Sequence, residues 1–135
     1  MTNSEQFITT LETIKDPMMT RAFISLPMRD HTIEEIQERQ DYIFSLLQTI
    51  RKEPYRLTFT LFTDEPEEGS ATNIWYLGRS IQALSKSDFV IFANDWLSAR
   101  GCVIERLICF MYGIPAIEER DLIEENKSFD ILHTT

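Results

Sequence analysis

The sequence is poor in several residue types, and each shortage argues against a class of protein. Its 135 residues include two cysteines and two histidines, which show no spacing typical of metal ligands. We therefore expect neither a metal nor another cofactor. No apolar run approaches the ~20 residues needed to cross a bilayer, and the N-terminus lacks the form of a signal peptide. We expect no membrane association and a cytoplasmic location.

Basic residues are also scarce: the chain has 13 lysines and arginines against 22 acidic residues, which gives a net charge of −9. Without a basic stripe, the chain is not expected to bind a nucleic-acid polymer. A small anionic ligand stays open, since a few arginines and helix N-termini can hold one phosphate. Cys102 and Cys109 lie seven residues apart on one predicted helix, roughly 10 Å along its axis. They cannot form a disulfide with each other, and we expect both to be buried structural thiols.

Apolar periodicity predicts helices that alternate with strands. Helices are predicted for 4–15, 32–52, 72–85 and the segment between Ser98 and Gly113, and strands for 21–26, 55–62, 89–93 and from 114 onward. This alternation implies an α/β fold with a mainly parallel sheet of four strands, or five if the tail adds one. No linker divides the chain, so 21–135 form one α/β domain and 1–20 a helical extension.

Local signals support these helices. Thr32 and Glu35 have the spacing of a capping box, and Ser98 is expected to cap the later helix. Two helices should bury an apolar face against the sheet. The residues of those faces are Ile74, Leu77, Ile81 and Leu84 in the first, and Val103, Ile104, Leu107, Ile108 and Met111 in the second.

Polar residues collect where the predicted strands end, and in parallel sheets that edge is where ligands bind. The first strand is followed by Ser25, Pro27, Met28 and Arg29, the third by Asn94, Asp95 and Trp96, and the helix beyond by Arg100, Gly101 and Glu105. We expect Glu105 to face the crevice beside the first loop. Structural readings stay open, because an acid is favoured near any helix start. Likewise, Asp95 can simply satisfy a turn, Trp96 can wedge between helices, and the arginines can be surface cations.

Several of these runs resemble the nucleoside 2-deoxyribosyltransferase superfamily, and above all its phage and bacterial relatives of unknown function. The matching runs are ISLPMRD at 24–30, WYLGRS at 75–80, SDFV at 87–90 and Trp96 with ARGCVIE at 99–105. The resemblance covers 21–118 and implies a compact, flavodoxin-like three-layer sandwich that binds a nucleoside or nucleotide. It implies that Glu105 attacks the anomeric carbon of the sugar and forms a glycosyl-enzyme intermediate. It also implies that Ser25 and Arg29 bind the 5′-phosphate.

The sequence departs from the transferases at three supporting positions. Ser80 stands where they carry an acid that handles the nucleobase, Ala99 where they carry an aspartate, and Phe23 where a tyrosine orients the nucleophile. Base exchange in the transferase manner is therefore not expected. Hydrolysis of another N-glycoside stays open, with Asp95 as a general acid or base.

Two functions follow from these residues. The first is an enzyme that cleaves or transfers an N-glycosidic bond with Glu105 as nucleophile. The second is a binding protein, a sensor or sequestering module, that holds a nucleotide-derived ligand without turning it over. We also expect a homodimer or larger homo-oligomer, assembled through the N-terminal helix and the tail.

Overall fold

The computed structural model describes residues 20–51, 54–58 and 66–133, with the backbone alone for 128–133. In chain order the elements are β1 (Arg21–Ser25), α2 (Ile33–Arg51), β2 (Arg56–Leu57), α3 (Thr72–Ser85), β3 (Phe89–Phe92), the 3-10 turn η2 (Trp96–Ser98), α4 (Arg100–Tyr112), β4 (Ala116–Glu118) and α5 (Glu119–His133). The helix predicted for 4–15 and most of the strand predicted for 55–62 lie outside the described residues.

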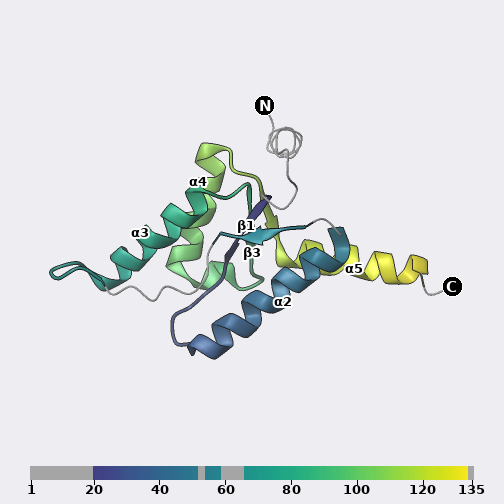
Figure 1. Ribbon diagram of the computed structural model, residues 1–135, viewed down its shortest axis with the longest axis horizontal. Coiled ribbons are helices and arrows are strands. Elements are labelled where there is room, and N and C mark those ends of the chain that lie inside the picture. The colour runs from purple at the N-terminus through teal and green to yellow at the C-terminus, as the bar shows by residue number, and fades with distance from the viewer. Residues whose placement is uncertain (1–19, 52–53, 59–65, 134–135) are drawn as a thin grey trace.

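The strands form one parallel sheet in the order β2-β1-β3-β4. At its centre Ser25 of β1 lies opposite Phe92 of β3. Helices α3 and α4 cover one face and α2 and α5 the other (Figure 1). The prediction of an α/β, flavodoxin-like three-layer sandwich is therefore confirmed. The tail forms helix α5 instead of a fifth strand, because it buries Leu122 completely beside α2.

Alternation along β1 and β3 divides the hydrophobic core into two layers. Residues 22, 24 and 26 of the first strand segment and 89, 91 and 93 of the second pack toward α2 and α5, with Ile43 and Leu47. Phe23, Val90 and Phe92 pack on the other side with Leu84 of α3 and Cys109 of α4. Ser25 has the same parity as Phe23, so its side chain points toward α4.

Of the two predicted helix caps, the capping box of Thr32 and Glu35 forms and the Ser98 cap does not. Thr32 and Glu35 form both bonds of the capping box, each at 3.1 Å. Gly113 ends α4 in the left-handed conformation, with φ of 69°. Ser98 does not cap α4: Ala99 occupies the N-cap position, and the Ser98 hydroxyl donates to the carbonyl of Asp95 at 2.7 Å. The short η2 turn places Ser98 one residue too early to cap the helix.

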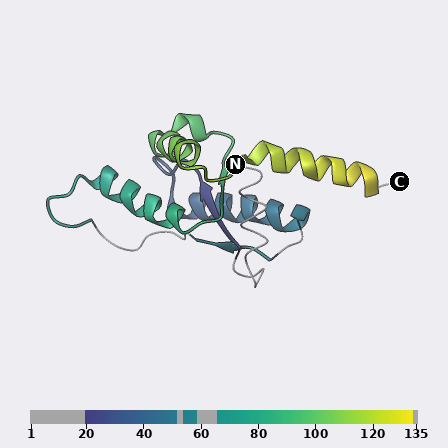
Figure 2. The same ribbon diagram turned by 90° about the horizontal axis from the view of Figure 1, so that it is seen from above.

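The predicted burial of the α3 and α4 faces was largely wrong. Helix α4 meets the sheet through the narrow stripe Cys102, Glu105 and Cys109, so Leu107 and Met111 stay 55% and 69% exposed. In α3, Leu84 alone is buried, and Ile74 is 71% exposed. Figure 2 shows why: α3 extends beyond the sheet on one side, as α5 does on the other. No helix in the described part of the chain combines the length and apolarity needed to span a membrane.

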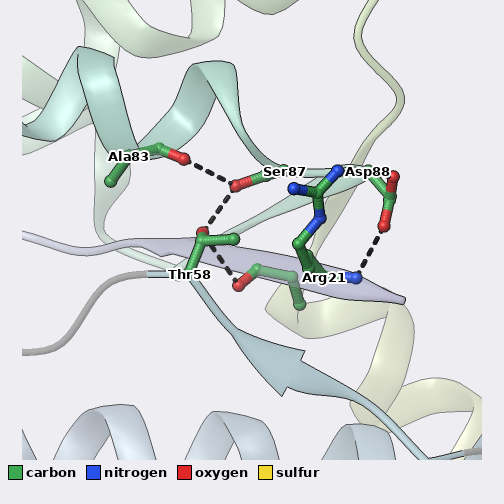
Figure 3. A network of polar contacts seen from close by, with 6 residues as sticks. Arg21, Thr58, Ala83, Ser87 and Asp88 are labelled. Atoms are coloured by element: carbon green, nitrogen blue, oxygen red, sulfur yellow. Dashed lines mark hydrogen bonds and ion pairs between the residues drawn. The ribbon is translucent and has the colours of Figure 1, made fainter. Parts of the chain in front are cut away.

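A polar network joins the elements at the amino end of β1 and β3 (Figure 3). The Thr58 hydroxyl lies 2.6 Å from that of Ser87 and also donates to the carbonyl of Ala22. The Asp88 carboxylate accepts a 2.7 Å bond from the amide of Arg21. These contacts tie β1, the segment after β2 and the turn after α3 together. They lie at the edge opposite the carboxyl ends of the strands, so they support the fold and leave the other edge for chemistry.

Candidate functional site

A buried hydrogen bond links the carboxyl end of β1 to α4. Ser25, the last residue of β1, is 1% exposed, and its hydroxyl donates to Oε1 of Glu105 at 3.1 Å. The contact forms because Ser25 points to the α4 side of the sheet and Glu105 lies on the buried stripe of that helix. In a sheet of this order, the crevice between β1 and β3 is where the connections diverge to opposite faces. Glu105 was expected to face an open crevice beside the first loop; it lies beside Ser25, but its side chain is buried.

Burial dominates the electrostatics of Glu105. The residue is 5% exposed, and desolvation raises its pKa to about 7, against a smaller lowering by the Ser25 hydrogen bond. Its second oxygen, Oε2, is buried and has no hydrogen-bond partner among the described residues. Near neutral pH the carboxyl is therefore divided between its protonated and ionised forms, a property that general acids and bases often share.

The two cysteines flank Glu105 along the same stripe. Burial raises the pKa of Cys102 to about 11 and that of Cys109 to about 12. Both thiols are free, buried and protonated at neutral pH, so neither is an activated nucleophile. Their small size lets α4 approach the sheet closely enough for Glu105 to reach Ser25. The sequence prediction that they are structural agrees with this arrangement.

Asp95, just beyond β3, is held by an arginine that the sequence analysis did not single out. Nη1 of Arg39, from α2, donates to Oδ2 of Asp95 at 2.8 Å, and Nη2 lies 3.6 Å from Oε1 of Glu119. The hydrogen bond and charge of Arg39 lower the pKa of Asp95. Asp95 is therefore ionised at neutral pH and can accept a proton there but has none to donate. One sequence pattern could have drawn attention to Arg39: it is a cation next to the buried positions Ile36, Gln40 and Ile43 of an amphipathic helix.

Glu119 completes this cluster and was also missed. Its carboxylate is 7% exposed and accepts a 3.0 Å hydrogen bond from the backbone amide of Asn94. One arginine from α2 thus joins the loop after β3 to the first residue of α5. No pattern in a single sequence indicates these contacts, because Arg39 and Asp95 lie 56 residues apart and Asn94 and Glu119 lie 25 residues apart.

The Trp96 side chain packs against residues of β3 and α4. Its ring meets Phe92 edge-on, with 5.7 Å between centroids, and its Nε1 donates to Glu118 at 3.0 Å. The guanidinium of Arg106 lies over both rings, 4.9 Å from the centroid of Phe92 and 5.4 Å from that of Trp96. Arg106, next to Glu105 in α4, was another residue that the sequence analysis passed over.

The remaining predicted residues take different positions around this edge. In the first loop Pro27 is buried, Met28 packs against both core layers, and Arg29 is exposed beside Asp30, which has φ of 65°. Arg100 and Gly101 form the first turn of α4, where a side chain at 101 would meet Leu77 of α3 at 3.7 Å. Ser80 lies half-buried within α3 and Asn94 is exposed after β3.

No protein-family model, curated protein or solved structure matches the chain. The resemblance to nucleoside 2-deoxyribosyltransferases therefore stays a prediction that rests on the quoted runs of sequence. Within residues 20–51, 54–58 and 66–133, no group of three or more His, Cys, Asp or Glu side chains is arranged to hold a metal ion. Glu105, Asp95 and the groups that position them are therefore the candidates for chemistry.

Proposed function

We propose that this chain is an enzyme that cleaves or transfers the N-glycosidic bond of a nucleoside or nucleotide, with Glu105 as the nucleophile. The observation that supports the proposal is the buried carboxyl at the carboxyl ends of β1 and β3: Ser25 holds one oxygen, and the other has no hydrogen-bond partner in the part of the chain that the structure describes. A buried group without a partner costs free energy, by about 1–3 kcal/mol. Such strain is found where a protein needs reactive groups.

The proposed reaction needs the ionised form of Glu105. One carboxylate oxygen forms a bond to the anomeric carbon while the carbon–nitrogen bond breaks, and the departing base keeps the electron pair and takes a proton from water. Water then attacks the glycosyl ester, a proton passes to the solvent, and the Glu105 carboxylate is released. We assign the role of base for that water to Asp95, which is ionised; its pairing with Arg39 lowers its pKa and hence its basicity.

The groups around Glu105 suit different parts of a nucleotide. Arg29 is exposed in the first loop and Arg100 begins a helix, so both are available to a phosphate. The Ser25 hydroxyl is engaged by Glu105, so it serves the nucleophile and leaves the phosphate to Arg29. The resemblance assigns the same loop to the 5′-phosphate.

The test is release of free base from a panel of nucleosides and 5′-monophosphates, followed by chromatography. We expect Glu105→Gln to abolish release, because an amide cannot form the glycosyl ester, and Ser98→Ala to retain it. The rate should increase as the pH increases through about 7 and then level off, since ionised Glu105 is the reactive form. Base release that survives in Glu105→Gln would exclude this nucleophile.

A second candidate, a protein that binds a nucleotide-derived ligand without reaction, is favoured by a different observation. Glu105 is buried and Asp95 is paired with Arg39, so neither carboxylate is freely accessible. Thermal stabilisation by a nucleotide with no base released over long incubation would support this candidate. Stabilisation together with base release would support the enzyme.

A further inference from the structure

The loop after β1 places His31 at the carboxyl edge of the sheet, just before α2 begins. The amide of His31 donates to the carbonyl of Met28 at 3.3 Å, which closes a tight turn. Inside this turn Asp30 has φ of 65°, a left-handed conformation that residues other than glycine seldom adopt. Strained backbone of this kind clusters at functional sites. The turn therefore gives His31 a defined position beside the candidate site.

The capping box of α2 also orients the His31 side chain. Oε1 of Glu35 accepts a hydrogen bond from the amide of Thr32, and Oε2 lies 3.4 Å from Nδ1 of His31. The backbone hydrogen bond from Thr32 and the side-chain hydrogen bond with His31 lower the pKa of Glu35, so it is a carboxylate at neutral pH. When Nδ1 of an imidazole donates to a carboxylate, Nε2 is left to exchange a proton.

His31 shares one face of α2 with the arginine that holds Asp95. Glu35 and Arg39 are four residues apart on the helix, and His31 reaches the same face through its contact with Glu35. Arg39 donates to Asp95 at 2.8 Å, so this face lies against the loop after β3. The hydrogen bond from Arg39 is the main cause that lowers the pKa of Asp95, and the charge of His31 lowers it further. The imidazole and the Asp95 carboxylate are therefore close enough for their charges to interact.

Asp95 in turn lies near the proposed nucleophile. On α4, burial is the main cause that raises the pKa of Cys102, and the charges of Glu105 and Asp95 raise it further. Both carboxyl groups are therefore close to this thiol. The side chains of Asp95 and His31 are 42% and 41% exposed, so water reaches both. Groups that can accept a proton thus follow one another from the buried Glu105 to the exposed imidazole.

We propose, on the basis of the function proposed above, that His31 carries away the proton that Asp95 takes from water when the glycosyl ester is hydrolysed. The water oxygen bonds to the anomeric carbon while the bond from that carbon to Glu105 breaks, and Glu105 keeps the electron pair as a carboxylate. The water proton passes to Asp95, then to Nε2 of His31, and from the imidazolium to the solvent. The imidazole is neutral again when the step ends.

This role answers the weak basicity of Asp95. Because Arg39 favours the ionised form of Asp95, a proton taken from water does not remain there. Imidazoles accept a proton near neutral pH more readily than carboxylates do. The Glu35 carboxylate pairs with the imidazolium that forms. His31 acts through Asp95 and does not need to touch the sugar.

The test separates the two steps of the reaction in His31→Ala. Its substrate is the 5′-monophosphate, of those tested above, from which the wild type releases base fastest. The first step does not need the proton carrier, so the initial burst of free base should be unchanged. The steady rate after the burst should fall by roughly 100-fold. The glycosyl-enzyme should accumulate, which intact mass spectrometry of the acid-quenched protein measures.

Free imidazole in the buffer should restore much of the steady rate of His31→Ala, because a small base can replace a missing proton carrier. A change that only disturbed the fold would not respond to imidazole. The matched control is Gln37→Ala, which removes an exposed side chain of the same helix that donates to Asp41 at 2.9 Å. This variant should keep both the burst and the steady rate of the wild type.

Circular dichroism shows whether each variant is folded, and His31→Gln replaces His31→Ala, with the same expected results, if the alanine variant is not. A wild type that releases no base contradicts the proposed function, and this role of His31 with it. The role of His31 alone is overturned if the wild type releases base and the folded variant keeps its steady rate. A burst that is lost with the steady rate, or a loss that imidazole does not restore, overturns it as well.

Discussion

The Ser25 hydroxyl donates to Oε1 of Glu105 across 3.1 Å, although the two residues lie 80 positions apart in the chain. This bond connects the end of a central strand to the second turn of α4, at the edge of the sheet where parallel folds place their ligands. The other oxygen of Glu105 is buried and finds no hydrogen-bond partner within residues 20–51, 54–58 and 66–133. The stability and the chemistry of this site therefore depend on the same carboxyl group.

Replacing Glu105 by glutamine should stabilise the protein above neutral pH. Because the folded pKa is about 7 and the ordinary value is 4.5, the wild type loses stability as the pH rises from 4.5 to 7, by up to about 3 kcal/mol. Glutamine carries no charge to desolvate. Urea unfolding at about pH 4 and pH 8 measures this: the variant should gain on the wild type only at the higher pH. An equal gain at both would contradict the raised pKa.

Replacing Ser25 by alanine should raise the pKa of Glu105 further, because the hydroxyl stabilises the ionised form. Carboxyl-carbon NMR titration would show the shift. We also expect a loss of about 1 kcal/mol of stability, typical of one hydrogen bond. The control is Ser98→Ala, which removes an exposed hydroxyl bound within its own turn. An unchanged or lower Glu105 pKa in Ser25→Ala would mean that this bond does not support the carboxylate.

Replacing Arg39 by methionine should destabilise the protein by about 1–3 kcal/mol, because it leaves the buried Glu119 carboxylate without its cation. The pKa of Asp95 should return toward 3.8. Since a lowered folded pKa contributes stability above the unfolded value and loses it as the pH falls, the variant should also be less sensitive to acid.

The matched control is Arg51→Met in the same helix, whose exposed pair with Glu125 should contribute about 0–1 kcal/mol. Chemical unfolding of both variants at several pH values makes the comparison. Equal losses in the two would show that Arg39 has no special role in joining α2 to Asp95 and Glu119.

Replacement by alanine should change the stability of the protein in opposite directions at two glycines. Gly113 has φ of 69° at the C-cap of α4, so Gly113→Ala should cost about 1 kcal/mol. Gly78 lies inside α3 with open space where a Cβ would stand, so Gly78→Ala should add about 0.5–1 kcal/mol. Thermal unfolding measures both changes. A neutral Gly113→Ala would contradict the left-handed cap.

Much of the fold could be predicted from short-range patterns. The strand at 21–25, the helix at 72–85 and the capping box of Thr32 and Glu35 each depend on residues close together in the chain. The alternation of these elements was enough to indicate a parallel sheet, and hence the edge at which Ser25 meets Glu105 and at which Asp95 follows β3. The pairings of Arg39 and Glu119 with the loop after β3 could not be predicted, because these residues come from helices distant in the chain. Arg106 is next to Glu105 in α4, but its contacts with Phe92 and Trp96 depend on how that helix packs.

Sequence alone therefore determined the elements, their order and the side of the sheet on which the candidate chemistry lies, since periodicity and helix caps act within a few residues. Tertiary structure decided which apolar stripe of α4 was buried. The small side chains of Cys102 and Cys109 let α4 pack on the sheet through the stripe that includes Glu105. Leu107 and Phe110 therefore remain exposed. Periodicity reports that a helix has an apolar face; only packing against the other layers decides what covers it.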